Sequence, residues 1–461
     1  MKSKVLLSAA CVTFALLSGG ATAGTTQVAP DVAMKMLNKQ AEQLEQQIVA
    51  VGDRVFTAVG YHGATTSMIV GDDGVIIVDT LMGPTSAQNA LNDLRAHSDL
   101  PVKAIIYTHS HGDHTGGAQV FADSSDGQPV GVYARAGFGH EYGGSPKLLP
   151  LAAKRGIRQF GRKLPQSEAT HRGVAAANTI DHDRAKGHIA PTIQFDEPVY
   201  RMTIANVEIE LHSAPGETDD ALYVWLPKDK VLFSGDNFYH SFPNLYAIRG
   251  TPFRDPSNWA ASVGKMAQHQ PHYLVPGHTL PIHGQAAATG ALSDYSEAIQ
   301  SVYDQTVEGM NTGKGPDQLA YEVKLPKHLR DKSYLTEFYG TVPHAVRAIY
   351  AGLLGWYDGN PTNLNPLEPR LEAERMAKLA GGQKALVRSM EQALSAQDFQ
   401  WALELADQVR WLDGVDIKRI REVKVAALRG LAAMEYNPPN RNYYLSYANE
   451  LESGELKAIW F

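Results

Sequence analysis

The residues most able to do chemistry stand in one short segment around position 110. Residues 109–114 read HSHGDH and supply three imidazoles and one carboxylate. His109 and His111 are two positions apart in an extended segment, so their side chains point the same way and can hold one metal ion. Asp113 and His114 follow the turn at Gly112 and can face a second metal ion. This spacing predicts a metal site rather than scattered surface histidines.

The strand before this motif must deliver it to the active site. Residues 103–107 read KAIIY and are largely apolar on both faces, as expected of a strand inside a covered sheet. In α/β folds, ligands and catalytic groups gather beyond the carboxyl ends of such strands. The glycine pair at 116–117 then lets the chain turn tightly into the next helix. The motif is therefore predicted to lie at the carboxyl edge of a buried sheet.

Composition narrows the kind of metal site and the class of function. The chain has 461 residues, one cysteine, 17 histidines and a formal net charge of −7 at pH 7. One cysteine excludes an intramolecular disulfide and any site built from two or more thiolates, so a metal must be held by imidazole and carboxylate. The negative charge, without a long basic block, makes nucleic-acid binding unexpected.

The N-terminus has the layout of a bacterial secretory signal. Lys2 and Lys4 precede an apolar run over residues 5–17, and Ala21-Thr22-Ala23 is a small-residue cleavage site. We expect residues 1–23 to be removed and the mature protein to be periplasmic or secreted. The alternative is a membrane anchor or a buried helix, although the apolar run is short for a membrane span. No later segment is long and apolar enough to cross a bilayer.

Periodicity divides the remaining chain into two parts. Residues 24–311 contain strand-like runs and are predicted to form an α/β sandwich, with sheets inside and helices outside. A short helix is expected near residues 38–47, and residues 154–188 are read as a long irregular excursion that shapes access to the site. The expected strands span residues 55–59, 67–70, 75–79, 103–107, 200–204, 207–212, 221–226 and 231–234, with a helix over 87–97.

The second part, residues 312–461, is predicted to be all-helical. Apolar residues recur at three- and four-residue spacing, and the pairs Gly381-Gly382 and Asp413-Gly414 mark turns between helices. The expected helices span residues 371–380, 383–394, 399–412 and 417–434. The apolar faces of this helical part indicate a homodimer.

The motif at 109–114 is the HxHxDH signature of the metallo-β-lactamase fold, and other segments resemble that superfamily. Residues 71–80 look like its early glycine turn and strand, which implies that Asp79 orients a metal ligand. The resemblance implies an αββα sandwich. It also implies three further ligands: Glu217 in the APGET segment, Asp236 as the bridging carboxylate in LFSGD, and His278 in VPGH.

Within that superfamily the chain resembles the alkyl sulfatases. Glu217 stands where most of the superfamily has histidine, and residues 244–250 read NLYAIRG. Residues 338–342 with His344, followed by GWYDGNP at 355–361, are similar to a further block of that family. The helices after it look like the alkyl sulfatase dimerisation domain. We expect no sterol-carrier-like third domain before Phe461, and Asp236 departs from the glutamate expected at the bridging position.

This resemblance implies a binuclear hydrolase of sulfate esters. One site would use His109, His111 and Glu217, a second Asp113, His114 and His278, with Asp236 bridging. Two Zn²⁺ ions are predicted, with Mn²⁺ or Fe²⁺ as alternatives, and metal-bound hydroxide is the expected nucleophile. Asp113, Arg249 and His344 are the predicted catalytic residues. Arg249 would clamp the sulfate and His344 would donate a proton to the leaving group or bind sulfate. An ordinary salt bridge for Arg249 and a structural role for His344 are the alternatives.

Two other classes of function remain open from the sequence. One is a different hydrolase of this fold, such as a phosphodiesterase, lactonase or β-lactamase. The other is a non-catalytic periplasmic protein with a structural metal, although a ligand set that leaves positions for water favours an enzyme. The sequence also leaves open an alkyl or aryl substrate and cleavage of the carbon–oxygen or the sulfur–oxygen bond.

Overall fold

Two β-sheets packed face to face form the centre of the protein. The structure, a computed structural model, describes residues 26–139, 146–176 and 183–456. In these residues one sheet has seven strands, in the order β1-β2-β3-β4-β5-β6-β7, and the other has six, in the order β13-β12-β11-β10-β9-β8. The strands are β1 (Gln47–Val51), β2 (Val55–Val59), β3 (Thr66–Val70), β4 (Val75–Val78), β5 (Val102–Ile106), β6 (Gly131–Arg135), β7 (Ile193–Phe195), β8 (Val199–Ile204), β9 (Val207–Ser213), β10 (Leu222–Leu226), β11 (Val231–Gly235), β12 (Tyr273–Pro276) and β13 (Ile282–His283).

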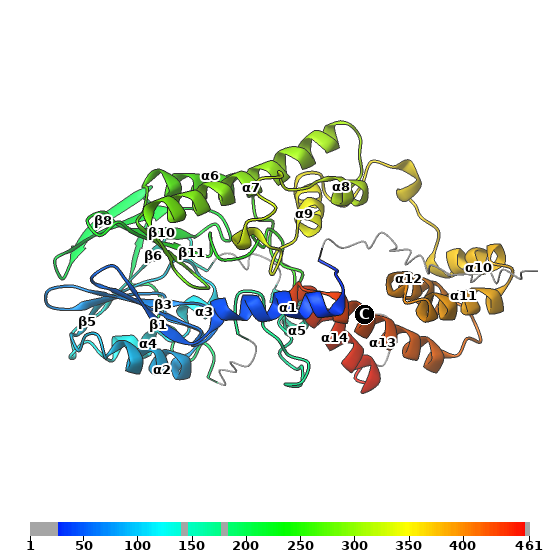
Figure 1. Cartoon of the computed structure of the whole chain (residues 1–461), viewed down its shortest axis with the longest axis horizontal. Helices are drawn as coiled ribbons and strands as arrows, with labels where there is room; N and C mark the ends of the chain where they lie inside the picture. The colour runs from blue at the N-terminus through cyan, green and yellow to red at the C-terminus, as the bar shows by residue number, and fades with distance from the viewer. Residues whose placement is uncertain (1–25, 140–145, 177–182, 457–461) are drawn as a thin grey trace, which may run out of the picture.

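Helices cover the outer face of each sheet, which confirms the predicted αββα sandwich. Between the sheets, apolar residues of β4 and β5 pack against those of β9, β10 and β11 in one core cluster. Helices α2 (Pro84–Leu94) and α4 (Ala118–Ala122) pack on the first sheet, and α6 (Pro256–Gln268) and α7 (Gln285–Asn311) on the second (Figure 1). Strands buried on both faces explain the continuous apolar runs in the sequence.

Most predicted elements of the sandwich are confirmed, with two exceptions. The helix expected at 38–47 is confirmed only in part: α1 spans Pro30–Ala41 and a 3-10 turn follows over Glu42–Leu44, but Gln47 already pairs with Val59 as the first residue of β1. Proline is favoured in the first turn of a helix and begins α1 here. The residues from Gln47 onward pair with β2 and therefore form a strand. The irregular excursion begins instead with a regular helix, α5 (Leu149–Gln159), whose polar and apolar residues divide between two faces.

The C-terminal helices form a separate core, as predicted. Buried residues from Ala373 to Leu456 make one cluster that is distinct from the sandwich. The helices are α10 (Pro369–Leu379), α11 (Gln383–Ser395), α12 (Phe399–Val409), α13 (Ile417–Met434) and α14 (Pro438–Glu452). Helices α8 (Pro316–Glu322) and α9 (Val342–Leu354) instead share a core with α6 and α7. The helices on both sides of residue 312 therefore share one core. The domain boundary predicted at that residue stays a prediction.

Helix α5 joins the sandwich to the C-terminal helices. It packs against α14, and the buried Arg158 guanidinium donates to both carboxylate oxygens of Glu450, with the Nη2–Oε2 distance 2.5 Å. Glu168, just beyond α5, accepts from Arg429 at 2.8 Å and from Asn449 at 2.8 Å. Figure 1 shows α5 beside α14, between the two parts of the molecule. Helix α5 and the residues directly after it are thus held by helices that come much later in the chain.

Two predictions concern membranes and export. Among the described helices, none combines the length and the apolar character that a bilayer crossing requires. The predicted signal peptide, residues 1–23, lies outside the described residues.

Candidate metal centre and cavity

Strand β5 carries the HxHxDH motif to the centre of the molecule. It ends at Ile106, and the one-turn helix α3 (Gly112–Thr115) begins inside the motif. The side chains of His109, His111 and His114 are buried, whereas that of Asp113 is partly exposed. His109 Nε2 lies 2.9 Å from His111 Nδ1, so the first two histidines converge as their spacing predicts.

Asp79 orients the motif from the end of the neighbouring strand β4. Its carboxylate accepts from the Thr108 backbone N–H at 2.8 Å and lies 2.7 Å from His114 Nδ1. The backbone φ of Asp79 is 57°, in the left-handed region, where this residue turns the chain out of the strand. The hydrogen bond leaves Nε2 of His114 facing the site, a common arrangement for a histidine that binds metal. This contact is the one that the predicted orienting role of Asp79 requires.

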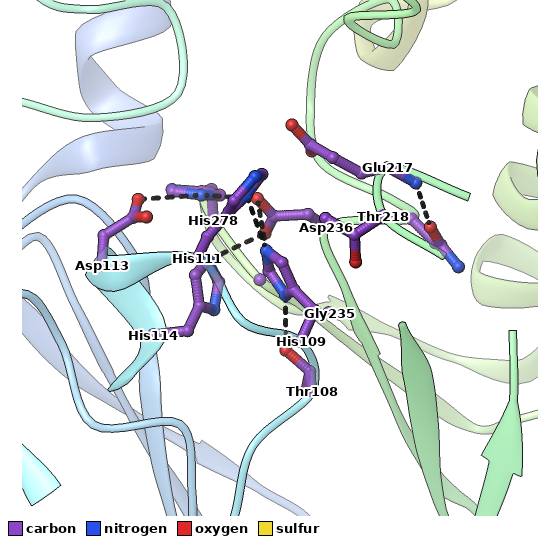
Figure 2. A network of polar contacts seen from close by, with 12 residues as sticks. Thr108, His109, His111, Asp113, His114, Glu217, Thr218, Gly235, Asp236 and His278 are labelled. Atoms are coloured by element: carbon purple, nitrogen blue, oxygen red, sulfur yellow. Dashed lines mark hydrogen bonds and ion pairs between the residues drawn. The ribbon is translucent and has the colours of Figure 1, made fainter. Parts of the chain in front are cut away.

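Asp236 is the centre of the cluster. It follows β11, and its carboxylate lies 3.2 Å from His114 Nε2, 3.2 Å from His278 Nε2 and 3.6 Å from His109 Nε2. Gly277 permits this approach, because a Cβ at that position would come within 2.2 Å of Asp236 Oδ1. Figure 2 shows Asp236 between the side chains that follow β5 and Glu217 on the opposite side. The location matches the bridging role predicted for this residue.

The predicted ligands gather in two groups. Donor atoms of Asp113, His114 and His278 lie within 4.8 Å of one another, which reproduces the predicted second site. The same limit groups His109 and His111 with Asp236. Glu217 is outside this group, so its predicted role as a ligand of the first site stays a prediction.

Glu217 is held by an arginine that the sequence motifs did not reveal. Arg254 Nη1 lies 2.6 Å from Glu217 Oε1 and also donates to the Asn244 carbonyl at 2.7 Å. Both side chains of the ion pair are nearly fully buried. Glu217 Oε2 has no hydrogen-bond partner in the described part of the chain, and Glu217 lines the cavity described below. Arg254 thus holds the carboxylate through one oxygen and leaves the other without a protein partner among the described residues.

Burial and neighbouring charges set the ionisation of the cluster. Burial lowers the pKa of His109 well below its ordinary value. Burial opposes the charged form of His114 as well, but the carboxylates of Asp236 and Asp79 raise its pKa well above the usual range. Although burial favours a neutral Asp236, the surrounding imidazoles hold the pKa of this carboxyl well below normal. A carboxylate among imidazoles is therefore the favoured state.

The donor set fits divalent metal ions. Buried Glu217 Oε2 lacks a hydrogen-bond partner within the described residues, and the buried Asp236 Oδ1 and His114 Nε2 face only each other, at 3.2 Å. Buried polar atoms rarely remain unsatisfied, so this arrangement favours a bound cation. Imidazole and carboxylate without thiolate is a donor set that suits zinc, manganese or iron. The residues that could hold such ions are those of the two groups above, with Glu217 adjacent.

A cavity of about 590 Å³ opens onto this cluster. His111, Asp113, Glu217, Asp236 and His278 line its floor. The segment predicted as an irregular excursion forms much of its wall, the position expected of a segment that shapes access to the site. The remaining wall residues are His62, Gly63, Met82, Gly112, Leu149, Ala152, Ala153, Gly156, Ile157, Phe160, Arg162, Arg172, Val174, Ala175, Arg184, Arg249, Gly250, Thr251, Pro252 and Tyr339.

The two predicted substrate-binding residues differ in position. Arg249 lines the cavity, its guanidinium carbon lies 5.7 Å from the centre of the Phe160 ring, and its Nη1 is buried without a hydrogen-bond partner in the described structure. His344 is in the first turn of α9 and does not line the cavity. Burial lowers the pKa of His344 to about 4, so it is neutral at physiological pH. Its predicted catalytic role gains no support from this geometry.

Three further arginines of the cavity were missed from the sequence. Arg162, Arg172 and Arg184 belong to the excursion, where no periodicity or motif marks them. The available signal was the abundance of arginine in a long segment near a predicted anion site.

Comparisons with known proteins agree with both parts of the molecule. Residues 60–278 match the family model "Metallo-beta-lactamase superfamily", and residues 315–454 match "Alkyl sulfatase dimerisation". A linear primary-alkylsulfatase from a Pseudomonas strain is 36% identical over 395 residues, which are 85% of this chain and 74% of that protein. An alkyl/aryl-sulfatase from Saccharomyces cerevisiae is 31% identical over 88% of this chain and 64% of its own length.

A solved structure extends the likeness to three dimensions. The stereoselective inverting sec-alkylsulfatase from Pseudomonas sp. superposes with a TM-score of 0.81 at 28% identity. The match covers 91% of this chain and 68% of that one. This chain therefore spans about two thirds to three quarters of the length of these relatives.

Proposed function

The chain belongs to the alkyl sulfatase family of the metallo-β-lactamase superfamily, and on this premise we propose that it hydrolyses sulfate esters of small alcohols. Water and the ester yield an alcohol and inorganic sulfate. Alkyl sulfate esters are the favoured class because several similar proteins are named alkylsulfatases.

The observation that carries this proposal is the position of Arg249 in the same cavity as the metal-ligand cluster. A planar guanidinium can donate two hydrogen bonds to a tetrahedral oxyanion. Arg249 has an unsatisfied Nη1 there, and Asp236 with its histidines forms the floor beneath it. An anionic ester can therefore contact the arginine and the cluster together.

Each residue has a defined role in the proposed reaction. Two divalent ions, for which we propose zinc, would offset the charge of the sulfate group and lower the pKa of a water molecule. Arg249 binds and orients the sulfate, Asp79 holds the ring of His114, and Arg254 holds Glu217. The apolar side of α5, including Ala153 and Ile157, receives the alcohol part and excludes water.

Paired substrates test the proposal. The metal-loaded protein should hydrolyse hexyl sulfate faster than hexyl phosphate, and Arg249→Gln should lower kcat/KM for the sulfate roughly 100-fold, as expected for loss of a charge-assisted bidentate contact. Metal content measured by elemental analysis should not change in this variant. Faster turnover of the phosphate ester would contradict the sulfatase proposal.

The bond that breaks can be identified separately. Hydrolysis in oxygen-18 water places the label in the alcohol if the carbon–oxygen bond breaks and in sulfate if the sulfur–oxygen bond breaks. We propose carbon–oxygen cleavage, because the guanidinium and the cluster stabilise sulfate as the leaving group. Label in the sulfate product would overturn this assignment.

We also propose that the protein is a homodimer through its C-terminal helices. Large apolar side chains are exposed along residues 353–379, within the dimerisation match. Such a patch on the surface of a folded protein is typical of an interaction site. Its members are Leu353, Leu354, Trp356, Leu364, Leu367, Leu371 and Leu379.

Light scattering tests the dimer. Wild-type protein should have twice the mass of one chain, and Trp356→Glu with Leu354→Glu should shift it to the monomer. Val32→Glu, at an exposed apolar position on α1, is the control and should remain dimeric. A monomeric wild type would contradict the proposal.

Export is the last part of the proposed function. We propose that residues 1–23 direct secretion and are removed after Ala23. N-terminal sequencing of the protein recovered from the periplasm should begin at Gly24. Recovery of a chain that begins at Met1 from the cytoplasm would contradict it.

A further inference from the structure

The cavity carries more positive charge than one sulfate monoester requires. Arg162, Arg172, Arg184 and Arg249 all line it. The acidic residues of the lining, Asp113, Glu217 and Asp236, are those that the proposed function assigns to the metal centre. Bound metal ions would neutralise these carboxylates, so the arginine charges would remain for the substrate.

Within the described residues, Arg162, Arg184 and Arg249 form no ion pair with a carboxylate. Arg162 and Arg249 instead lie against the same aromatic ring, with guanidinium carbons 5.3 Å and 5.7 Å from the centre of Phe160. The two guanidinium carbons are therefore at most about 11 Å apart, the sum of these distances. One small ligand can reach both.

The charges of the arginines act on different carboxylates of the cluster. The charge of Arg249 acts on Glu217, whereas the charges of Arg162 and Arg172 interact with Asp113. Burial, together with the charges of Arg184 and Arg172, lowers the pKa of Arg162 to about 10. Like charges gathered in a cavity raise the free energy of the empty site and favour an anion that lies between them.

We propose that the preferred substrate is a sulfate ester with a second anionic group, such as a carboxylate or another sulfate. This inference rests on the proposed function and specifies its substrate class. The sulfate to be cleaved contacts Arg249 beside the metal cluster, and the second anion contacts Arg162 and Arg184. The ring of Phe160 and the apolar residues of α5 contact the chain that joins the two groups.

Two esters of equal length test this inference: hexyl sulfate and its analogue with a terminal carboxylate. We expect kcat/KM to be at least roughly tenfold higher for the dianion, as a charge-assisted contact predicts. The preference should weaken as salt concentration rises. Arg162→Gln and Arg184→Gln should each lower kcat/KM for the dianion several-fold more than for hexyl sulfate.

The control variant is Arg201→Gln, which removes one positive charge from the exposed face of β8 and should leave the ratio of the two kcat/KM values unchanged. A wild-type ratio near one, or variants that lower both substrates equally, would overturn the inference while the sulfatase function stands. If neither ester is hydrolysed, the proposed function fails. Calorimetric titration of both esters then decides the inference, because equal affinity would overturn it and tighter binding of the dianion would support it.

Discussion

The metal cluster and the cavity wall above it are built in different ways. The cluster is assembled from the ends of neighbouring strands, and residues 109–114 contribute four of its side chains. The wall comes from α5 and the excursion after it, which contact α14 through Arg158 and Glu450. The strands that carry the cluster are held by apolar packing on both of their faces. The position of the wall depends instead on a few polar contacts between segments that are distant in the sequence.

This difference separates two properties of the protein. Strand ends in a packed sandwich are rigid, so the relative positions of the metal ligands follow from the fold itself. A change in the position of the C-terminal helices can therefore move the cavity wall without moving the candidate metal ligands. Metal binding should therefore tolerate changes at the helical contact, and substrate affinity should not.

Loss of a ligand in the cluster should have the largest effect. His109→Ala should lower kcat at least roughly 1,000-fold, because the charge that stabilises the transition state is lost with the metal. Elemental analysis should show less metal per chain, and circular dichroism should show an unchanged fold. His328→Ala, at an exposed histidine paired with Glu297, is the control and should keep full activity.

Removing the support of one ligand should have an intermediate effect. Asp79→Asn weakens the contact with His114, so metal affinity should fall about 10- to 100-fold, as is typical for residues that orient a ligand. Competition with a chelator measures this affinity. The surface variant Asp73→Asn should match the wild type. Wild-type affinity in Asp79→Asn would mean that the strand alone orients His114.

A change at the helical contact should affect the wall and leave the metal in place. Glu450→Gln removes a buried charge partner of Arg158 and should lower the free energy of unfolding by about 3 kcal/mol. Because α5 lines the cavity, KM should rise several-fold while metal content stays constant. Glu452→Gln, on the same helix at an exposed pair with Arg429, is the matched control. Loss of metal in Glu450→Gln would show that the two regions are not independent.

The change with the smallest expected effect on activity concerns a buried carboxyl group at the junction of α1 and α13. This group should make the stability of the protein depend on pH. Burial raises the pKa of Glu435 to about 7, although Thr26 and Asn437 donate hydrogen bonds to it. The folded protein thus holds this proton more tightly than the unfolded chain. The resulting stability is fully present below about pH 4.5 and is lost as pH rises from there through about 7, by about 3 kcal/mol.

Chemical denaturation at several pH values measures this dependence. Glu435→Gln should flatten the fall in unfolding free energy between roughly pH 4.5 and pH 7, since glutamine keeps the neutral form. At any one pH, the kcat of this variant should equal the kcat of the wild type. An unchanged slope would assign the dependence to other groups.

Much of the fold and of the metal centre could be predicted from the sequence. The runs at β2 and β11 were recognisable because a buried strand needs continuous apolar residues, and α11 and α13 because a helix on a core needs an apolar face. The helix α14 was not predicted, because its apolar residues do not concentrate on one side. The bounds of the helix predicted at 38–47 were too late, because polar glutamines fit a helix and only pairing with β2 assigns Gln47 to a strand.

The sequence by itself determined the candidate metal ligands that are close in the chain. His109, His111, Asp113 and His114 converge because covalent geometry fixes the direction of side chains a few residues apart. Their order with Asp236 and His278 also indicated the family. Only the tertiary structure decided that Arg254 holds Glu217 and that Arg162, Arg184 and Arg249 share one cavity. Such contacts depend on packing between segments whose separation in sequence carries no information about their distance in space.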